Sequence, residues 1–333
     1  MTTDAPEVAA DLEQYRRELT AYCYRMLGSG SEAEDAVQET MLRAWKNADG
    51  FEGRASVRSW LYRIATNVCI DMQRSSQRRA RPIELGPSSD PDESLLAETL
   101  HPELPWISPI NEDSVLPDNG DPADIAVARD SIRLAFVTAL QHLPAKQRAA
   151  LILCEVLRWP AAEAAELLET SVASVNSALQ RARATLAELP SDPAPVQLDA
   201  DNAELLAKYV DAFERYDIES FVKLLHDDAV MSMPPFSVWI EGASKIGEFM
   251  VLPGPSACAN SKLIPVRANG CPAFGQYKPD TDNGGYTPWG LQVLEIVDGR
   301  IAHWNCFLDT ASIFPTFGLP THLPAVPAEH LPA

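Results

Sequence analysis

Two apolar stripes at helical spacing mark the first folded piece of the chain. Val37, Met41 and Trp45 recur every fourth position, and a second stripe runs from Val57 to Val68. Apolar residues at this period predict amphipathic helices that bury one face. We therefore expect an all-helical bundle over residues 11–81.

A second helical piece, rich in alanine and leucine, covers residues 124–189 and contains a helix-turn-helix pattern. Pro160 opens one helix, Glu169-Thr170-Ser171 breaks it, and Val172, Val175, Leu179, Ala182 and Leu186 line one face of the next helix. Such a second helix fits the DNA major groove and reads base edges from its first turns. An ordinary helical hairpin is the alternative, and the turn lacks the usual glycine. The polar face of this helix comprises Ser171, Ser174, Asn176, Ser177, Gln180, Arg181 and Arg183.

The third piece, residues 201–317, changes from helices to strands. Leu291–Val297 and Arg300–Phe307 flank Asp298-Gly299, a pair that favours a type I′ turn and therefore a β-hairpin. This piece is expected to be α+β. A proline-rich tail, residues 318–333, follows and is expected to be loosely held.

Two connections separate the three pieces. Residues 82–123 carry eight prolines without any apolar period, which predicts an extended spacer. The cluster Leu104–Ile107 is the exception, and it is as compatible with docking on a neighbouring domain as with a free spacer. Residues 190–200 form a short second linker.

Charge is distributed unevenly along the chain. The formal net charge of −20 argues against a nucleic-acid binder if the chain is taken as a whole. Arg54 to Arg81, however, carries seven arginines against one acid, whereas Glu84 to Asp130 carries twelve acids against one arginine. These blocks predict a basic surface followed by an acidic, chain-like segment.

Length, apolar content and cysteine spacing limit the classes of protein to which the chain can belong. A chain of 333 residues with 46% apolar residues predicts two or three domains with real cores. The six cysteines form no CxxC pair, so they indicate reduced thiols and not a zinc ribbon, and no metal or cofactor is expected. The absence of a long apolar run and of a basic start at the N-terminus favours a cytoplasmic protein.

The order of the motifs resembles that of a bacterial sigma-70 family factor of the extracytoplasmic function (ECF) group. Glu34–Trp45 resembles region 2.2, Phe51–Arg54 with Trp60–Asn67 resembles regions 2.3 and 2.4, and Leu143–Arg148 with the helix-turn-helix resembles region 4. The third piece is similar to SnoaL-like domains in three short motifs, Ala212–Asp217, His226–Val230 and Met233–Pro235, and the full arrangement is similar to the SigG-like ECF factors. The resemblance implies a multidomain fold: two all-α sigma domains, region 2 at 11–81 and region 4 at 124–189, and a cone-shaped α+β SnoaL-like domain at 201–317.

The resemblance also implies roles for particular residues. One helix face would bind core RNA polymerase, with Asp35, Gln38 and Glu39 lying opposite Val37, Met41 and Trp45; its residues are Glu34, Asp35, Gln38, Glu39 and Arg43. Promoter melting and contacts to the minus-ten element would fall to Phe51, Glu52, Arg54, Ser56, Arg58, Arg63, Asn67 and Arg74. The polar face of the second helix of the helix-turn-helix would read the minus-thirty-five element, although Asn176 and Ala178 are uncharged where many members are basic. The acidic spacer would thread polymerase channels that otherwise hold nucleic acid.

The third piece carries side chains that suit either a pocket or acid–base chemistry. Trp239, Trp289, His303 and Trp304 are candidates to line a pocket, and the candidate acid–base groups are Tyr209, His226, Asp227, Asp228, His303 and Asp309. We expect a regulatory domain and not an enzyme, with an anti-sigma factor or a small ligand as possible further partners. A conventional helix-turn-helix regulator and a small-molecule enzyme of the polyketide cyclase or isomerase type remain the rival hypotheses.

Overall fold

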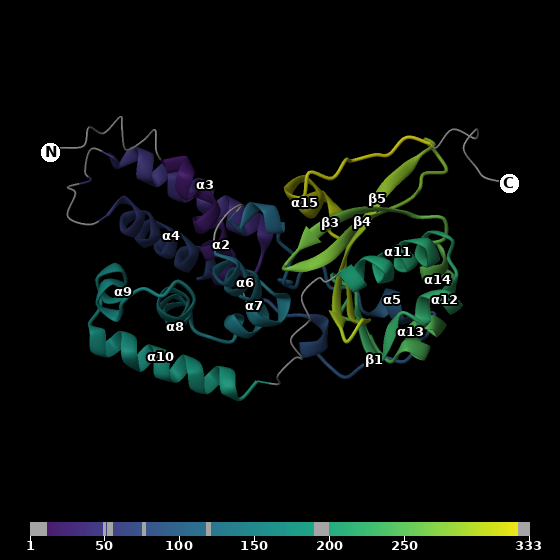
Figure 1. Ribbon diagram of the computed structural model, residues 1–333, viewed down its shortest axis with the longest axis horizontal. Coiled ribbons are helices and arrows are strands. Elements are labelled where there is room, and N and C mark those ends of the chain that lie inside the picture. Colours follow the sequence, from purple (N-terminus) through teal and green to yellow (C-terminus); the bar gives the residue numbers. More distant parts are fainter. Residues whose placement is uncertain are drawn as a thin grey trace. The chain divides into compact units, whose positions relative to one another are not determined.

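The computed structural model describes residues 12–48, 51, 56–74, 78–117, 121–189 and 200–325. The chain divides into two compact units, drawn in Figure 1. The first unit consists of Met1–Ala80 and Ile107–Asp192, and the second of Arg81–Trp106 and Pro193–Ala333. Among the described residues, no helix has both the length and the apolar character needed to cross a bilayer.

The described part of the first unit is entirely helical, as the apolar periods predict. Its helices are η1 (Leu12–Tyr15), α2 (Arg16–Leu27), α3 (Gly30–Lys46), α4 (Val57–Gln73), η4 (Glu112–Ser114), α6 (Pro122–Asp130), α7 (Leu134–Gln141), α8 (Ala145–Leu151), the π-helical turn η5 (Ile152–Val156), α9 (Ala161–Leu167) and α10 (Val172–Ala187).

Helices α9 and α10 form the predicted helix-turn-helix. Ser171 caps α10 by accepting a hydrogen bond of 3.1 Å from the backbone N–H of Ser174. The turn contains no glycine, and Glu169 adopts the left-handed conformation there, with φ of 51°. A non-glycine residue in this region is uncommon and costs some strain. Glu169 therefore adopts the conformation for which helix-turn-helix motifs usually have a glycine.

The second unit contains a six-stranded sheet covered by helices. The strand order is β2-β1-β6-β5-β4-β3, with β1 and β6 parallel and every other pair antiparallel. In Figure 1, α11, α12, α13 and α14 gather on one side of the strands. The elements are η3 (Pro82–Glu84), α5 (Leu95–Glu98), α11 (Ala200–Glu214), α12 (Ile218–Val222), β1 (Leu225–Ser232), β2 (Trp239–Glu241), α13 (Ala243–Met250), α14 (Pro253–Ser256), β3 (Lys262–Ala268), β4 (Cys271–Pro279), β5 (Tyr286–Val297), β6 (Arg300–Phe307) and α15 (Thr310–Thr316).

The hairpin predicted around Asp298-Gly299 is confirmed. Both residues have positive φ, 48° and 72°, as a type I′ turn requires, and they join β5 to β6. The α+β prediction for this piece is likewise confirmed, and β5 begins five residues earlier than the sequence pattern suggests.

The predicted spacer 82–123 is not a free chain over its described residues. Residues 81–106 belong to the second unit, and residues from Ile107 onward belong to the first. Ile107 is 1% exposed and donates its backbone N–H to the carbonyl of Ala80. The docking alternative for the cluster Leu104–Ile107 is therefore the one that the structure supports.

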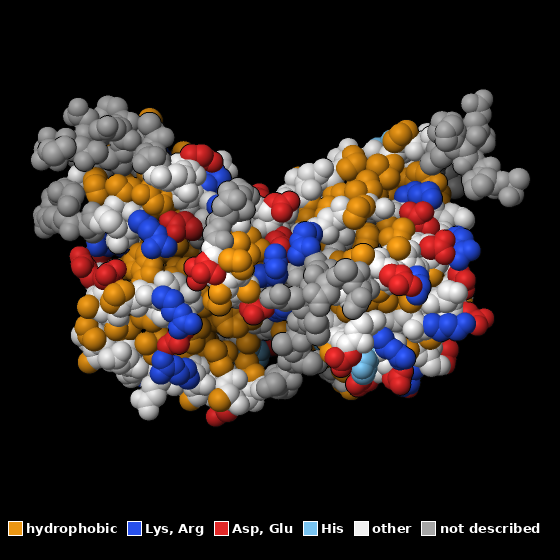
Figure 2. Space-filling view, in the orientation of Figure 1, with side chains coloured by type: hydrophobic (Ala, Val, Ile, Leu, Met, Phe, Trp, Pro, Cys, Tyr) orange, Lys and Arg blue, Asp and Glu red, His pale blue; other side chains and the backbone are white. Residues whose placement is uncertain are grey.

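Charged side chains of both signs are interleaved on the face drawn in Figure 2, where Lys and Arg lie among Asp and Glu over each unit. The net charge of −20 thus does not appear on this face as one continuous acidic surface.

Candidate functional site

Helix α3 presents one exposed stripe that combines polar and apolar side chains. Its opposite side is buried, with Ala33, Ala36, Val37, Thr40 and Ala44 all fully covered. The exposed stripe consists of Asp35, Gln38, Leu42 and Trp45, and the exposed fraction is 45% for Leu42 and 64% for Trp45. The sequence prediction that Trp45 lies opposite Asp35 and Gln38 is wrong, because all three residues are exposed on the same side of α3.

Of the three remaining residues predicted for this face, Glu39 and Arg43 are engaged within the chain. Arg43 donates to the Glu39 carboxylate at 2.7 Å and lies 3.8 Å from that of Asp71. Glu34 is exposed, and partial burial of its carboxyl, together with the neighbouring charge of Asp35, raises its pKa. Glu39 and Arg43 therefore border the stripe as an ion pair.

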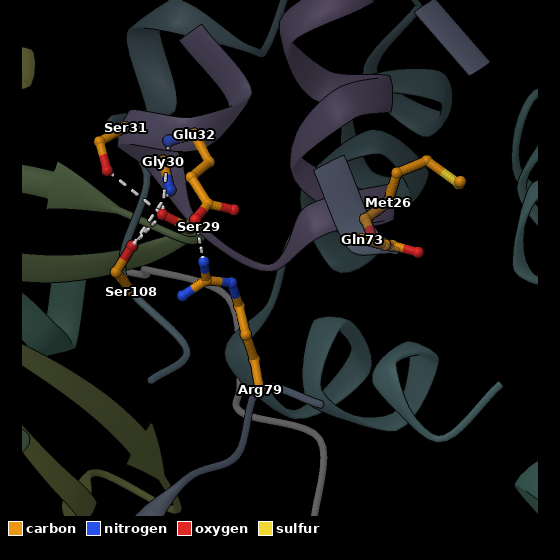
Figure 3. Close-up of polar contacts among 8 residues, drawn as sticks. All are labelled: Met26, Ser29, Gly30, Ser31, Glu32, Gln73, Arg79 and Ser108. Carbon is orange, nitrogen blue, oxygen red and sulfur yellow. Dashed lines mark hydrogen bonds and ion pairs between the residues drawn. The ribbon is translucent and has the colours of Figure 1, made fainter. Parts of the chain in front are cut away.

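The start of α3 is anchored by residues far away in the sequence, as Figure 3 shows. The Ser29 hydroxyl accepts from the backbone N–H of Glu32, and the Ser108 hydroxyl accepts from that of Gly30 at 3.1 Å. Arg79 forms an ion pair with Glu32. Since these contacts cap the helix and fix its first turn, the exposed stripe has a rigid support.

Helix α4 carries the described part of the predicted minus-ten surface. Ser56 is the N-cap, accepting from the backbone N–H of Ser59 at 3.0 Å, so this hydroxyl has a structural role. Half-buried Trp60 packs against Phe51, with the ring centres 5.1 Å apart. Asn67 is exposed and Arg74 is 76% exposed. Glu52 and Arg54 lie outside the described residues.

Arg58, a predicted promoter contact, is held by two other parts of the first unit. It forms an ion pair with Glu18 at 2.7 Å, and its guanidinium lies 5.3 Å from the ring centre of Tyr62 and 5.2 Å from that of Trp159. Guanidinium groups over aromatic faces are attracted by the ring quadrupole. Trp159 comes from the segment before α9, so that segment covers part of α4.

Arg148, a residue of α8, joins the last turn of α2 to α7 and to the turn before α8. Its Nε donates to Leu140 O at 2.8 Å, and its terminal nitrogens donate to Met26 O, Leu143 O and both oxygens of Gln141. No carboxylate is among these acceptors, and burial lowers the pKa of Arg148 to about 10. The guanidinium is thus used as a multiple hydrogen-bond donor, chiefly to main-chain carbonyls.

The predicted recognition face of α10 is exposed, whereas its other side is buried through Val175, Leu179 and Ala182. Val172 was predicted to be on the apolar side, and 43% of it is exposed. The residues of the predicted face that are exposed are Ser171, Ser174, Asn176, Gln180, Arg181 and Arg183. Ser177 is half-buried and accepts from Arg181 at 2.5 Å, and Arg183 pairs with Glu155.

The four residues predicted to line a pocket in the second unit do not come together. Trp304 is buried among Phe213 and Phe221, and the neighbouring His303 faces the other side of the sheet. Trp239 donates its indole N–H to Gly86 O, and the 38%-exposed Trp289 ring lies under the Lys278 ammonium at 3.1 Å. The prediction of a shared pocket is therefore corrected.

The candidate acid–base groups are also dispersed. His226 pairs with Asp228 and Arg300 pairs with Asp227 at the surface, and Asp309 caps α15. Tyr209 donates to Gln292, and burial raises its pKa well above the usual value.

The polar chain that starts at Tyr209 ends on the main chain. Gln292 donates to Gln276 at 2.9 Å, Gln276 donates to Ser261 at 3.0 Å, and Ser261 donates to the carbonyl of Cys258. The phenol stays neutral and the chain is internally satisfied, so these groups form no acid–base pair.

Comparison with known proteins identifies the class. Residues 12–79 match the family model of Sigma-70 region 2, residues 133–186 match Sigma-70 region 4, and residues 202–277 match the Nuclear transport factor 2 (NTF2) domain. The chain belongs to the ECF sigma factors of the sigma-70 family and carries an additional C-terminal NTF2-like, SnoaL-like domain. The fold class predicted from the sequence is confirmed.

The chain is similar to particular ECF sigma factors over most of its length. The chain is 44% identical over 322 residues to the ECF RNA polymerase sigma factor SigG of Mycobacterium tuberculosis, an alignment that covers 95% of this chain and 85% of that protein. It is 28% identical over 250 residues to SigJ of the same species, covering 73% of this chain and 72% of SigJ. The crystal structure of SigJ matches with a TM-score of 0.57 over 93% of this chain and 99% of that chain, at 22% identity, which supports the shared fold.

Proposed function

We propose that this sigma factor docks on core RNA polymerase through the exposed stripe of α3. The observation that carries the proposal is Trp45, 64% exposed beside Asp35 and Gln38 on a helix whose opposite side is fully buried. Large aromatic side chains act as anchors of protein interfaces. A carboxylate and an amide beside such an anchor suit a partner surface rich in arginine.

Promoter DNA is assigned to two further surfaces. Arg63 and Asn67 of α4 and Arg74, which follows the last residue of that helix, are proposed to meet the opened minus-ten element, together with Arg58 after its release. Cationic groups of this kind follow the backbone of single strands. The exposed face of α10 is proposed to read the minus-thirty-five element, with Gln180 and Arg181 as the residues most suited to base and phosphate contacts.

Reading both elements requires the first unit to open. The two elements are named for positions about 25 base pairs apart, roughly 85 Å at a rise of 3.4 Å per pair. In the first unit, by contrast, the Tyr62 ring of α4 lies 5.0 Å from the Trp159 ring before α9. We infer that the packed first unit is the form of the free chain and that polymerase binding separates regions 2 and 4.

The second unit is proposed to regulate initiation and not to catalyse a reaction. The helix side of its sheet is filled by Tyr209, Phe213, Phe221, Phe274 and Trp304, and its acid–base candidates are dispersed. An anti-sigma factor is a further proposed partner, and the cytoplasm, where polymerase acts, is the proposed site of action.

Run-off transcription tests the proposed function. We expect the full chain, added to purified core polymerase and a promoter library, to give transcripts with discrete start sites that core polymerase alone does not give. Folded full chain that gives no transcript and does not bind core polymerase would overturn the proposal. Tight duplex binding by the chain without polymerase would instead favour the conventional regulator.

The role of α10 is tested with Arg181→Ala in the holoenzyme, on a promoter identified in that assay. We expect weaker promoter binding and a salt dependence whose slope falls by about 1, as for the loss of one phosphate contact. Lys208→Ala is the matched control, because Lys208 is an exposed cation of the second unit that pairs with Glu204. An unchanged slope for Arg181→Ala would remove this residue from the DNA surface.

A further inference from the structure

The first half of the connection between regions 2 and 4 lies along an edge of the NTF2-like sheet. Strand β2 is one of the two edge strands of this sheet. The backbone carbonyl of its Trp239 accepts from Ser89 N–H at 2.8 Å, and its indole donates to Gly86 O at 2.9 Å. An edge strand offers unpaired main-chain groups, and an added segment satisfies them.

The same connection forms a second set of backbone hydrogen bonds with residues 235–237, which come just before β2. Ser237 N–H donates to Thr99 O at 2.7 Å, and His101 N–H donates to Pro235 O at 2.9 Å, with Leu100 directly opposite Phe236 in an antiparallel bridge. Residues 86–101 thus contact the sheet edge at both ends, although more than a hundred positions separate them from it in the chain.

Between these two pairings the connection inserts apolar side chains. Leu95 and Leu96 of α5 pack against the hydrophobic core of the second unit. The methyl group Cδ1 of Leu96 lies 3.3 Å from the position that a Cβ on Gly254 would occupy, so a glycine makes room for it. Asp90 also pairs with Lys245 at 2.5 Å, but both groups are exposed, and such a pair contributes little.

Docking folds the connection back on itself. Ser89 and His101 are twelve positions apart and would span about 40 Å if extended, whereas their partners Trp239 and Pro235 are four positions apart and span about 14 Å at most. Release of residues 86–101 therefore lengthens the connection between regions 2 and 4 by about 25 Å.

We propose that the NTF2-like domain is a clamp for residues 86–101, and that it restrains initiation by keeping the connection between regions 2 and 4 short. The bound segment is an acidic, proline-containing stretch of the same chain, held by main-chain pairing at both ends and by the leucines between them. Core polymerase and the clamp then compete for the connection. This inference rests on the proposed function, in which regions 2 and 4 must separate.

A reversible disulfide tests the clamp. Leu100 and Phe236 form a non-hydrogen-bonded antiparallel pair, whose Cα atoms lie about 4.5 Å apart in general, within the range that a disulfide bridges. We expect the Leu100→Cys/Phe236→Cys chain, oxidised, to give at least tenfold less run-off transcript than after reduction. Each single variant, oxidised and reduced in parallel, corrects for the native thiols. Equal transcript from the oxidised and reduced forms would overturn the proposal.

A release variant tests the opposite direction. Leu96→Asp is expected to raise transcript several-fold and to speed hydrogen exchange at the amides of Ser89, Ser237 and His101. Leu85→Asp, a leucine of the same connection that is 44% exposed, is the matched control and should change neither. Rapid exchange of these amides in the unmodified chain would overturn the clamp itself. A third outcome is slow exchange of these amides combined with no transcript from any reduced chain. It would establish that the segment is docked, but it would overturn the proposed function and therefore the restraint of initiation.

Discussion

Replacing Arg148 with alanine is expected to lower the free energy of unfolding of the full chain by about 3 kcal/mol, because buried carbonyls lose a charged donor. For a unit of this size that corresponds to a fall in Tm of roughly 6–12 °C. Arg148→Lys should recover only part of the loss, since an ammonium has fewer donors and no planar fork. Thermal unfolding followed by circular dichroism measures the effect.

Arg181→Ala provides the control for Arg148, because Arg181 is an exposed arginine on α10. A surface change of this kind should stay within about 0.5 kcal/mol. Since Met26 O belongs to region 2 and the other acceptors belong to region 4, the Arg148→Ala chain should also open more readily. A loss of stability no larger than that of the control would contradict the role assigned to this guanidinium.

The double variant Asp35→Arg/Trp45→Ala is expected to weaken binding of core RNA polymerase by at least about 100-fold, or roughly 2.7 kcal/mol. Trp45→Ala removes an aromatic anchor of the interface. Asp35→Arg places a positive charge against a partner surface that is proposed to be rich in arginine. Both residues are exposed, so the Tm of the free chain should stay close to that of the unmodified protein. Binding is measured by titrating labelled core polymerase with each chain.

Asp124→Arg is the matched charge reversal for that experiment, because Asp124 is also exposed but belongs to α6 and not to the stripe of α3. It should leave the affinity for core polymerase within about twofold, a change that corresponds to roughly 0.4 kcal/mol. If the double variant bound as well as this control, the polymerase surface would have to lie elsewhere on the first unit.

Helix α3 illustrates both the value and the limit of periodicity. The helix itself and its polar face were predictable, because the apolar spacing is close to 3.6 residues per turn. A strict spacing of four, however, drifts by about 40° at each step, so Trp45 lies about 80° away from Val37. Trp45 consequently faces solvent, and only the buried set of small residues reveals the true inner face.

Alternation in the strands sets a similar limit in the second unit. The sequence places His303 and Trp304 side by side, and both are types that line pockets. Successive residues of a strand point to opposite faces, so Trp304 joins the aromatic core while His303 does not. Neighbouring residues of a strand cannot both line one pocket. The pocket prediction could therefore be tested only once β6 was known to be a strand.

The docked connection could not be predicted from local signals. Its prolines and acids are typical of a solvated spacer, and Leu95 and Leu96 form too short an apolar run to indicate burial. The groups that bury them, including Gly254 and the edge at Trp239, belong to a distant part of the chain. Long-range pairing of this kind is visible only once the sheet is built.

The shared boundary between the connection and the NTF2-like domain changes how truncations of this chain should be interpreted. A fragment that stops before residue 200 leaves Leu95 and Leu96 without the core that covers them, and the complementary fragment carries a bare edge at β2. Each fragment therefore exposes a surface prone to aggregation, either apolar side chains or an unpaired strand edge, that is covered in the intact chain. Because Ile107–Asp192 belongs to the first unit and lies in the chain between Arg81–Trp106 and Pro193–Ala333, no single cut leaves both units with a complete core.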